Sequence, residues 1–491
     1  MGKLLEICSK YQKGNSYPYM KSAVILICML SLIGAFFVST IREGHDWGGD
    51  FSMYIMHAKN ISQGHAYVDT GYIYNSSFAR LGPKRYPPVF PIFLSVVHKF
   101  LGFNLTAMKI EGILFFLLGL LFIYAVLSKH LFPQYSLLIV LIIGFNPYFW
   151  QIKDQIIPDI PFLFFTYLTI FLVNKLYLSE KNKMLDVVLV GVLVYLSYAL
   201  RTVGIVFIPA LFIYDFIKNK RVRILPFKIT SIFLVLALLQ HKFLASNSSY
   251  LDNIRFSISI IAHNIFNYLK SFIILWENGY SDIFRNVLFI LVSLCAVLGY
   301  FSLVRKKLSF SEIFFFVYFL IIILWSFEGI RLLIPIIPLY ILYILIGLKD
   351  INKFLKQKQL ILFGLFIFVI FISYAGKYTS ANWGPIEIGI QKQESTELFK
   401  YIKENTDKED VLVFIKPRVL SLMTERRSAV YHEQDHGGEL LTYFKEINAS
   451  YLIAYPDRDI PYLSTFIENH KSHFEEVYSN ADFIIYKLKY G

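Results

Sequence analysis

The first feature that could support chemistry is a carboxylate, Asp50, directly before an apolar stretch with helical spacing. Residues 51–61 place their apolar side chains on one face of a helix, and such a helix would lie along a membrane surface. Asp50 would begin this helix, with Tyr54 and His57 on the same face. Asp50 could cap the helix by accepting backbone N–H bonds, or it could serve as a base where membrane meets water.

A second segment brings two cations to the start of another helix. Lys84 and Arg85 precede Tyr86, Pro87 and Pro88. A residue before proline favours an extended backbone, and Pro88 is well placed to open a helix. Because the N-terminus of a helix favours anions, the two cations could hold a phosphate. The alternative is a pair of anchors at the lipid headgroups.

Three further charges stand at the ends of apolar segments. Arg201 and Arg331 each lie between two apolar runs, and Asp159 begins another. Ionisable residues at such positions are costly and usually functional, and the planar guanidinium group suits phosphate oxygens. The alternatives are an interfacial anchor for either arginine, a local pair with Glu328 for Arg331, and helix capping for Asp159.

A metal site is the least supported of the chemical possibilities. His45, Asp46, Asp50 and His57 carry metal-binding groups, but their spacing follows no fixed ligand pattern. We therefore assign no metal ligand and no certain cofactor, and we keep a divalent metal ion as an alternative.

The composition indicates what must position these residues. Of the 491 residues, 56% are hydrophobic and only 17% are charged, whereas soluble proteins carry about 25% charged residues. A helix of roughly 20 apolar residues crosses a bilayer, so we predict an all-α polytopic membrane protein with about eleven transmembrane helices. The predicted spans lie near residues 22–39, 107–127, 134–150, 157–177, 185–200, 203–217, 225–244, 283–304, 310–327, 330–348 and 359–376.

The basic residues of the short connections indicate the orientation. With the N-terminus in the cytoplasm, nineteen lysines and arginines fall on the inner side and three on the short outer connections, as the positive-inside rule expects. Residues 1–376 carry a net charge of +17, and residues 377–491 one of −4. The basicity therefore indicates contact with inner-leaflet headgroups and not with nucleic acid.

Three segments fall outside the membrane in this arrangement: 40–106, 245–282 and the tail 377–491. The tail alternates amphipathic helices with short β-rich runs, which predicts a small α/β domain outside the membrane. We expect a folded cap over the membrane domain of residues 1–376. The predicted helices are Glu394–Asn405, Gly438–Ile447 and Pro461–His470, and the predicted strands are Val411–Ile415, Tyr451–Tyr455 and Phe483–Leu488.

The order and sidedness of these motifs resemble the GT-C glycosyltransferases, in particular the protein O-mannosyltransferase and lipid A aminoarabinose transferase group (glycosyltransferase family 39). The resemblance runs over most of residues 20–376, and the tail resembles the C-terminal domain of bacterial members. Many members carry Asp-Glu where this chain has Asp50-Phe51, which leaves the second acidic role open, with Asp159 as the candidate. The motifs that carry the resemblance are Gly49-Asp50, Arg85-Tyr86-Pro87-Pro88, Pro158-Asp159-Ile160-Pro161 and Arg331-Leu332-Leu333-Ile334-Pro335.

The resemblance implies an enzyme of the cytoplasmic (inner) membrane that transfers a sugar at its outer face. The donor would be a polyprenyl-phosphate-linked sugar, the acceptor a glycan, lipid or protein, and the configuration would invert. The implied roles are general base for Asp50, a second acidic role for Asp159, donor-phosphate binding for Lys84, Arg85, Arg201 and Arg331, and a substrate pocket for Tyr54, His57 and Tyr86. The alternatives are a transporter or flippase of a lipid-linked saccharide, and a polysaccharide polymerase or ligase.

Overall fold

The computed structural model describes residues 17–179, 183–244, 258–324, 329–355, 360–431 and 438–490. Glu328 lies outside these ranges, as do six of the nineteen cations counted above for the inner side: Lys3, Lys10, Lys13, Lys181, Lys356 and Lys358.

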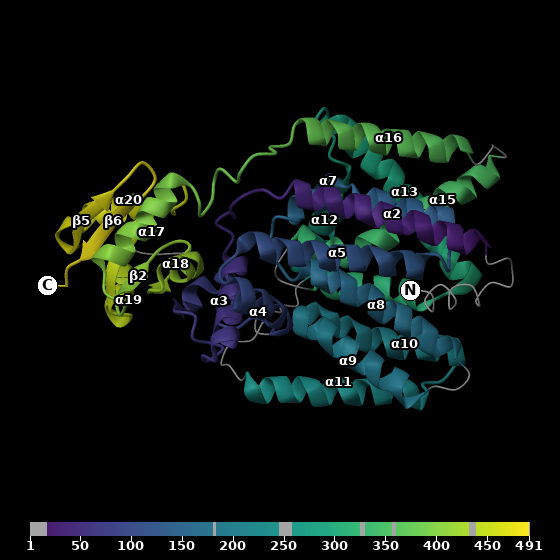
Figure 1. Ribbon diagram of the computed structural model, residues 1–491, viewed down its shortest axis with the longest axis horizontal. Helices are drawn as coiled ribbons and strands as arrows, with labels where there is room; N and C mark the ends of the chain where they lie inside the picture. Colours follow the sequence, from purple (N-terminus) through teal and green to yellow (C-terminus); the bar gives the residue numbers. More distant parts are fainter. Residues whose placement is uncertain are drawn as a thin grey trace.

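A bundle of apolar helices forms the larger part of the molecule (Figure 1). Within the described ranges, nine helices are long and apolar enough to cross a membrane, so the chain is a multi-pass membrane protein. The bundle contains α2 (Tyr17–Ser39), α5 (Leu105–Leu127), α6 (Pro133–Gly144), α7 (Pro147–Ile152), α8 (Asp159–Leu178), α9 (Met184–Leu200), η2 (Thr202–Val206), α10 (Phe207–Asn219), α11 (Ile224–Phe243), α12 (Ile258–Ser271), η4 (Phe272–Trp276), α13 (Asp282–Lys307), α14 (Phe310–Ile323), η5 (Ile330–Ile336), α15 (Ile337–Phe354) and α16 (Leu360–Thr379), where η marks a 3-10 helix.

Each of the eleven predicted spans coincides with a helix, although α6, α9 and α14 are shorter than a full span. The segment Ile258–Trp276, which we expected outside the membrane, is also long and apolar enough to cross it. Its contacts lie at one end of the bundle. Asn264 donates a hydrogen bond to the carbonyl of Ile323 at the end of α14, and Leu275 accepts one from Asn146 between α6 and α7. This placement agrees with a position beside the outer ends of the spans.

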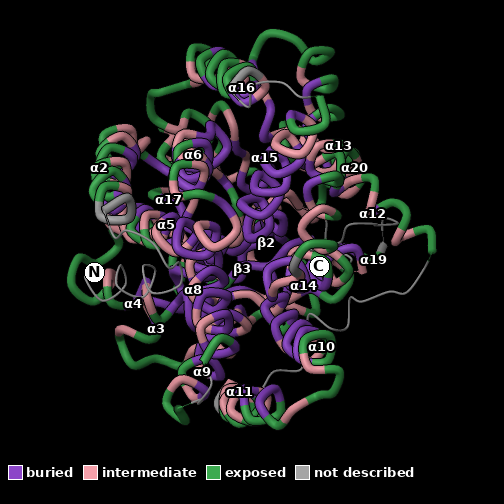
Figure 2. Tube along the Cα trace, turned by 90° about the vertical axis from the view of Figure 1, so that its right-hand side faces the viewer, coloured by how far each residue is buried: buried purple, intermediate pink, exposed green. Residues whose placement is uncertain are grey.

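Two helices form the centre of the bundle. Figure 2 looks along the helices and shows α8 and α15 buried, with α2, α11 and α16 at the rim. These central helices are almost entirely apolar over residues 160–173 and 337–348, as a surrounded helix must be. Helix α13 crosses α15 at very close range, because a Cβ atom at Gly299 would lie only 1.9 Å from the carbonyl oxygen of Tyr343. Small residues allow such close approach of helices in membranes.

The tail forms a six-stranded sheet with helices, and one strand comes from elsewhere in the chain. The order is β1-β3-β2-β4-β6-β5, parallel from β1 to β4 and antiparallel from β4 to β5. Strand β1 belongs to the first outer loop. The three predicted helices and three predicted strands are present, whereas β1, β3, β5 and α18 were not expected. The elements are β1 (Tyr72–Ile73), α17 (Gln393–Asn405), β2 (Val411–Val413), α18 (Pro417–Thr424), β3 (Arg427–Ala429), α19 (Gly438–Glu446), β4 (Ala449–Ala454), α20 (Tyr462–Asn469), η6 (Lys471–His473), β5 (Phe474–Ser479) and β6 (Ile484–Leu488).

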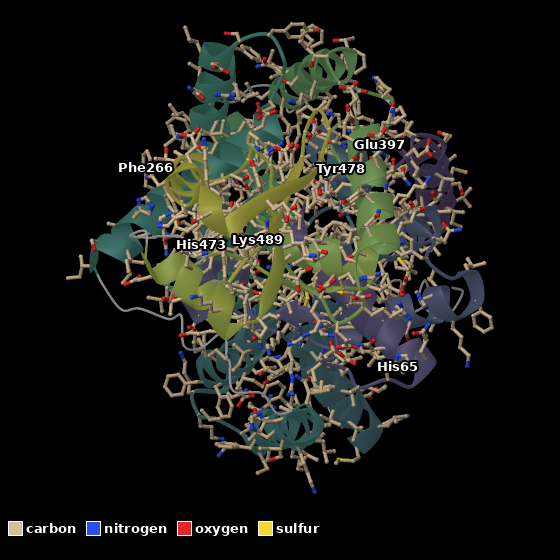
Figure 3. The ribbon with its side chains drawn as sticks, turned by 90° about the vertical axis from the view of Figure 1, so that its left-hand side faces the viewer. His65, Phe266, Glu397, His473, Tyr478 and Lys489 are labelled. Carbon is tan, nitrogen blue, oxygen red and sulfur yellow. The ribbon has the colours of Figure 1, made fainter. Side chains whose placement is uncertain are left out.

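The first outer loop lies between the bundle and the tail (Figure 1). It contains α3 (Gly49–Gln63), η1 (Ser76–Leu81) and α4 (Val89–Leu101) as well as β1. Helix α3 begins where the periodicity predicts, but it does not lie open on a membrane surface. Most of its residues from Phe51 to Asn60 are buried, because α4 and α18 both pack against it. Seen from the tail's side, the α/β domain covers this end of the bundle, with His473 and Lys489 towards the viewer (Figure 3).

Candidate active site

Asp50 is the second residue of α3, and its two carboxylate oxygens have different partners. Oδ2 lies 2.7 Å from Nη2 of Arg331, while Oδ1 accepts a hydrogen bond of 2.8 Å from the hydroxyl of Tyr86. Gly48 occupies the cap position of α3, so the interpretation of Asp50 as a helix cap is wrong. The carboxylate instead joins two distant segments, the first outer loop and the start of the tenth predicted span.

A third partner of Asp50 comes from the tail. Arg418, in the first turn of α18, is 2% exposed and has its Nη1 atom 3.7 Å from Oδ1 of Asp50. Burial alone would raise the pKa of Asp50, but the charges of Arg331 and Arg418 and the hydrogen bonds from Arg331 and Tyr86 outweigh it and lower the pKa to about 2. Asp50 is therefore ionised at neutral pH.

A cavity of about 390 Å³ opens beside the Asp50–Arg331 pair. Both side chains line it, together with Tyr148, Gln155 and the chain at Gly49. The two charged side chains are partly accessible, with 36% of Asp50 and 40% of Arg331 exposed. The pair can therefore meet a ligand in the cavity.

A second ion pair stands behind the first. Asp159 at the start of α8 is 1% exposed and accepts a hydrogen bond from Arg201, which joins α9 to η2. Pro158 occupies the cap position of α8, so the capping interpretation of Asp159 is also wrong. The charge of Asp159 also acts on Arg331. Thus Asp50, Arg331, Asp159 and Arg201 form an alternating set of charges.

This set favours an anionic ligand. Once Arg418 is added to the set, three arginines pair with Asp50 and Asp159 among the described residues, so positive charge is in surplus. Oδ2 of Asp159 and the hydroxyl of Tyr148 are buried without a hydrogen-bond partner in the part of the chain described. Since buried polar atoms are nearly always hydrogen-bonded, these two atoms could bind hydroxyl groups or water beside the cations.

The other two predicted phosphate ligands lie elsewhere. Arg85 donates a hydrogen bond to the carbonyl of Leu244 at the end of α11, and Lys84 is exposed. Neither lines the cavity beside Asp50. The structure thus brings together two of the four predicted cations, Arg201 and Arg331, and separates Lys84 and Arg85 from them.

The three predicted pocket residues Tyr54, His57 and Tyr86 are brought together behind Asp50 and do not line its cavity. The ring of Tyr54 packs 4.8 Å from that of Tyr86, and Nε2 of His57 accepts a 3.4 Å hydrogen bond from the Tyr86 backbone N–H. Nδ1 of His57 forms a hydrogen bond with the carbonyl oxygen of Tyr67, and the two atoms are 2.7 Å apart. Burial lowers the pKa of His57 to about 4, so the ring is neutral and supports Tyr86.

The candidate metal ligands do not gather. Within the described residues, no group of three histidine, cysteine, aspartate or glutamate side chains could hold a metal ion. His45 stacks on Phe51 with ring centroids 3.7 Å apart, and Asp46 accepts hydrogen bonds from Gly48 and Gln155. These side chains shape the turn that leads to Asp50.

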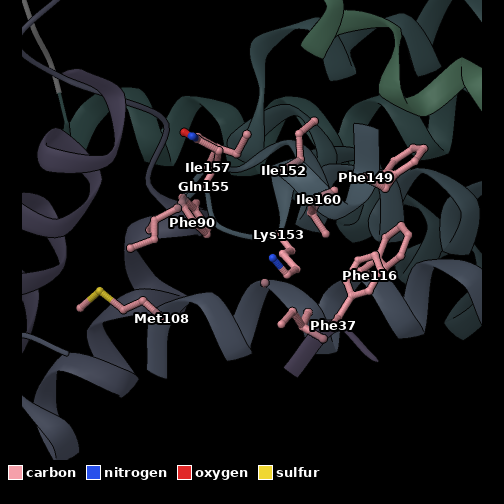
Figure 4. A pocket seen from close by; sticks show the side chains of 13 residues that line it. Phe37, Phe90, Met108, Phe116, Phe149, Ile152, Lys153, Gln155, Ile157 and Ile160 are labelled. Carbon is pink, nitrogen blue, oxygen red and sulfur yellow. The ribbon is translucent and has the colours of Figure 1, made fainter. Parts of the chain in front are cut away.

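Buried lysines hold the same turn from the bundle. Lys109 donates hydrogen bonds to the carbonyls of Arg42 and Gly44, at 2.7 and 2.6 Å. Lys153 pairs with Asp154 at 2.7 Å, and its side chain points into a small apolar hollow of about 10 Å³ (Figure 4). Asp154 also accepts a hydrogen bond from the Arg42 backbone N–H. The loop before α3 is thus fixed to α5 and α7.

Sequence reasoning missed two residues of the site, Arg418 and Tyr148. Arg418 had one local signal, since a cation in the first turn of a helix opposes the helix dipole and usually needs an external partner. Tyr148 had none, because it lies in a segment that predicts only a membrane span.

Comparisons with known proteins agree with this architecture. A sequence model of the dolichyl-phosphate-mannose-protein mannosyltransferase family matches residues 85–244. No curated protein sequence matches the chain.

Solved structures share the fold at low sequence identity. ArnT from Cupriavidus metallidurans bound to undecaprenyl phosphate aligns with a TM-score of 0.59 and 12% identity, over 95% of this chain and 97% of that one. The oligosaccharyltransferase AglB from Archaeoglobus fulgidus, in complex with an inhibitory peptide and a dolichol-phosphate, aligns with a TM-score of 0.59 and 11% identity, over 94% and 74%. AftD, a mycobacterial arabinofuranosyltransferase, gives 0.54 and 12%, over 94% and 41%. The chain therefore has the GT-C fold and resembles the group of protein mannosyltransferases and ArnT.

Proposed function

We propose that this protein is a glycosyltransferase that moves a sugar from a polyprenyl-phosphate carrier to an acceptor at the outer face of the cytoplasmic membrane. The observation that carries the proposal is the Asp50–Arg331 pair at a cavity of about 390 Å³, set in a GT-C fold. One base and one exposed cation are the two groups that transfer from a phosphate requires.

In the reaction, Asp50 takes a proton from the attacking hydroxyl or amine of the acceptor. The acceptor atom bonds to the anomeric carbon as the bond from that carbon to the phosphate oxygen breaks. The attack comes from the face opposite the phosphate, so the configuration inverts. The electron pair leaves with the polyprenyl phosphate, whose charge Arg331 stabilises with Arg201 behind it. The lipid tail stays in the bilayer.

The acceptor can reach the site from a neighbouring cavity. Tyr148 lines the Asp50 cavity and also a small hollow that includes Glu277 and Lys377. These two residues line a polar cavity of about 650 Å³ beside the start of α13. These shared lining residues place the three spaces side by side, which supports an approach of the acceptor from the side of α13.

The test is transfer by the purified protein from polyprenyl-phosphate sugars to glycan, lipid A and peptide acceptors. Asp50→Asn should reduce turnover by about 100-fold or more, since general base catalysis contributes roughly 10² to 10⁴. Asp69→Asn is the matched control, because Asp69 is an exposed carboxylate of the same loop. Wild-type turnover in Asp50→Asn would overturn the base assignment, and absence of transfer with every donor would overturn the function.

A further inference from the structure

The tail sends one side chain into the candidate active site. Arg418 donates hydrogen bonds to the hydroxyl of Tyr86 and to the carbonyl of Leu81. Its guanidinium group also lies over the rings of Tyr72 and Tyr86, 5.0 and 5.2 Å from their centroids. A buried arginine with this many partners in the first outer loop cannot be a simple surface contact between two domains.

The first outer loop leaves space for this side chain. A Cβ atom at Gly82 would lie 3.0 Å from Nη2 of Arg418, and one at Gly49 would lie 3.7 Å from its Cδ. Gly82 also has a φ of +92°, which disfavours any larger residue there. Two glycines and two tyrosines thus enclose the arginine.

Two further contacts fix the tail against this loop. Tyr72 of β1 pairs with Ser428 of β3 in a parallel ladder, so the loop adds a strand to the sheet of the tail. Trp47, three residues before Asp50, packs against four aromatic rings of the tail: those of Phe399, Phe414, Tyr455 and Phe483. The position of Asp50 therefore depends on residues nearly 400 positions away in the chain.

We propose that Arg418, acting through Tyr86, is a positioning residue that holds Oδ1 of Asp50, so that Oδ2 is the oxygen that takes the acceptor's proton. Among the described residues, Oδ2 pairs with Arg331, and this inference rests on the proposed function, in which the donor phosphate engages Arg331. Oδ1 of Asp50 would keep the hydrogen bond that Tyr86 donates, while Oδ2 becomes available to the acceptor. The two oxygens of Asp50 would thus have separate tasks. A base that is oriented by another group in this way is common in enzymes.

The four groups that face Asp50 come from three segments. They are Arg331 of η5, Tyr86 before α4, Arg418 of α18 and Lys416 before α18. Because the charge of Arg418 favours the ionised carboxylate, its removal should raise the pH at which Asp50 takes up a proton. This change in pH reports the charge of Arg418 at Asp50, whereas a loss of kcat with an unchanged KM reports its positioning role.

The experiment compares Arg418→Gln, Arg418→Lys, Tyr86→Phe and the double variant Arg418→Gln/Tyr86→Phe in the full-length protein. We expect kcat to fall by roughly 10- to 100-fold in Arg418→Gln, as expected for a displaced base, with an unchanged KM for the donor. The acid limb of the pH profile should move to higher pH, and Arg418→Lys should recover part of the loss. The double variant should be little worse than either single variant, because both act on one oxygen.

A second measurement does not depend on transfer. A water-soluble carbodiimide modifies protonated carboxyl groups, and mass spectrometry can follow Asp50 as the pH is lowered. The pH midpoint of Asp50 modification should be higher in Arg418→Gln than in wild type, and it should be unchanged in two control variants. These are Glu425→Gln, which removes an exposed pair with Lys59 at 2.5 Å, and Arg426→Lys, whose side chain in the described part of the chain donates hydrogen bonds to groups of the tail.

An unchanged midpoint in folded Arg418→Gln would overturn the inference, as would a loss of kcat equal to that in both controls. If the wild-type protein transfers no sugar yet the midpoint still shifts, the proposed function fails while the link from Arg418 to Asp50 stands.

Discussion

At the scale of single residues, Asp50 is held too firmly to be a strong base in the resting protein. Its pKa of about 2 reflects two arginines and a tyrosine hydroxyl, and a carboxylate with so low a pKa accepts a proton poorly. A phosphate that engages Arg331 would weaken the bond to Oδ2 and raise the proton affinity of Asp50. We therefore expect the donor to activate the base that its own transfer needs.

Arg331 is the cation that should decide donor binding, because it is the arginine exposed to the cavity. Arg331→Ala should weaken binding of undecaprenyl phosphate about 10- to 100-fold, since a hydrogen bond to a charged group contributes roughly 1.5–3 kcal/mol. Arg331→Lys should recover part of the loss but not the two-pronged geometry. Arg285→Ala is the control, because Arg285 pairs with Asp282 away from this cavity. Equal affinities in Arg331→Ala and wild type, measured in detergent, would contradict the assignment.

His57 should give the protein a pH dependence of stability. The pKa of His57 is lowered from 6.5 to about 4 in the folded protein, so folding favours the neutral ring. Its contribution is complete above pH 6.5 and is lost as the pH falls through 4. As the pH is lowered from 6.5 to 4, the melting temperature should therefore decline less in His57→Gln than in wild type. A glutamine side chain can form hydrogen bonds with both Tyr67 and Tyr86 without taking up a proton.

The matched control for this titration is His65→Gln, since His65 is exposed in the same loop. It should follow the wild-type curve. A His57→Gln curve parallel to that of wild type would show that His57 does not titrate between the folded and unfolded states.

At the scale of elements, the periodicity predicted α3 with Asp50 at its start, but not what covers it. Apolar spacing records that one face is buried, whereas α3 is buried by α4 on one side and α18 on the other. The helices at the eleven predicted positions were predictable because each carries its own apolar signal. Strand β1 was not, because two residues contain too little pattern to indicate a pairing with β3.

Trp47 is the test of how firmly α18 is held against α3. It is 7% exposed among rings of the tail, and truncation of such a residue costs about 3–5 kcal/mol. Trp47→Ala should speed hydrogen exchange in α18 and β1 and lower kcat, with donor affinity kept. Trp383→Ala is the control, since Trp383 is 47% exposed and packs on bundle residues such as Trp150. If hydrogen exchange in α18 is as slow in Trp47→Ala as in wild type, Trp47 does not hold α18 against α3.

At the scale of the whole molecule, two contacts of Asp50 restrict the topology. Asp50 pairs with Arg331 and approaches Arg418, so all three lie on one side of the membrane and even numbers of spans separate them. The predicted spans satisfy this, with eight between Asp50 and Arg331 and two between Arg331 and Arg418. A full crossing by Ile258–Trp276 would make the first number odd. No local sequence pattern contains this restriction, because it depends on side chains that meet only in the fold.

Accessible cysteines would decide the orientation. In a variant with the three native cysteines replaced by serine, Tyr280→Cys and Lys489→Cys should react with a membrane-impermeant maleimide in intact cells, and Lys306→Cys only after permeabilisation. These side chains are 67%, 58% and 64% exposed, so protection would report the membrane and not burial. Labelling of all three after lysis is the control. Tyr280 and Lys489 are separated by four spans whether or not Ile258–Trp276 crosses, so reaction of Lys306→Cys without either of them would contradict this topology. If His65→Cys, exposed in the first outer loop, still reacts in that case, Ile258–Trp276 crosses the membrane and Arg331 could not pair with Asp50; if His65→Cys is also protected, the site lies in the cytoplasm.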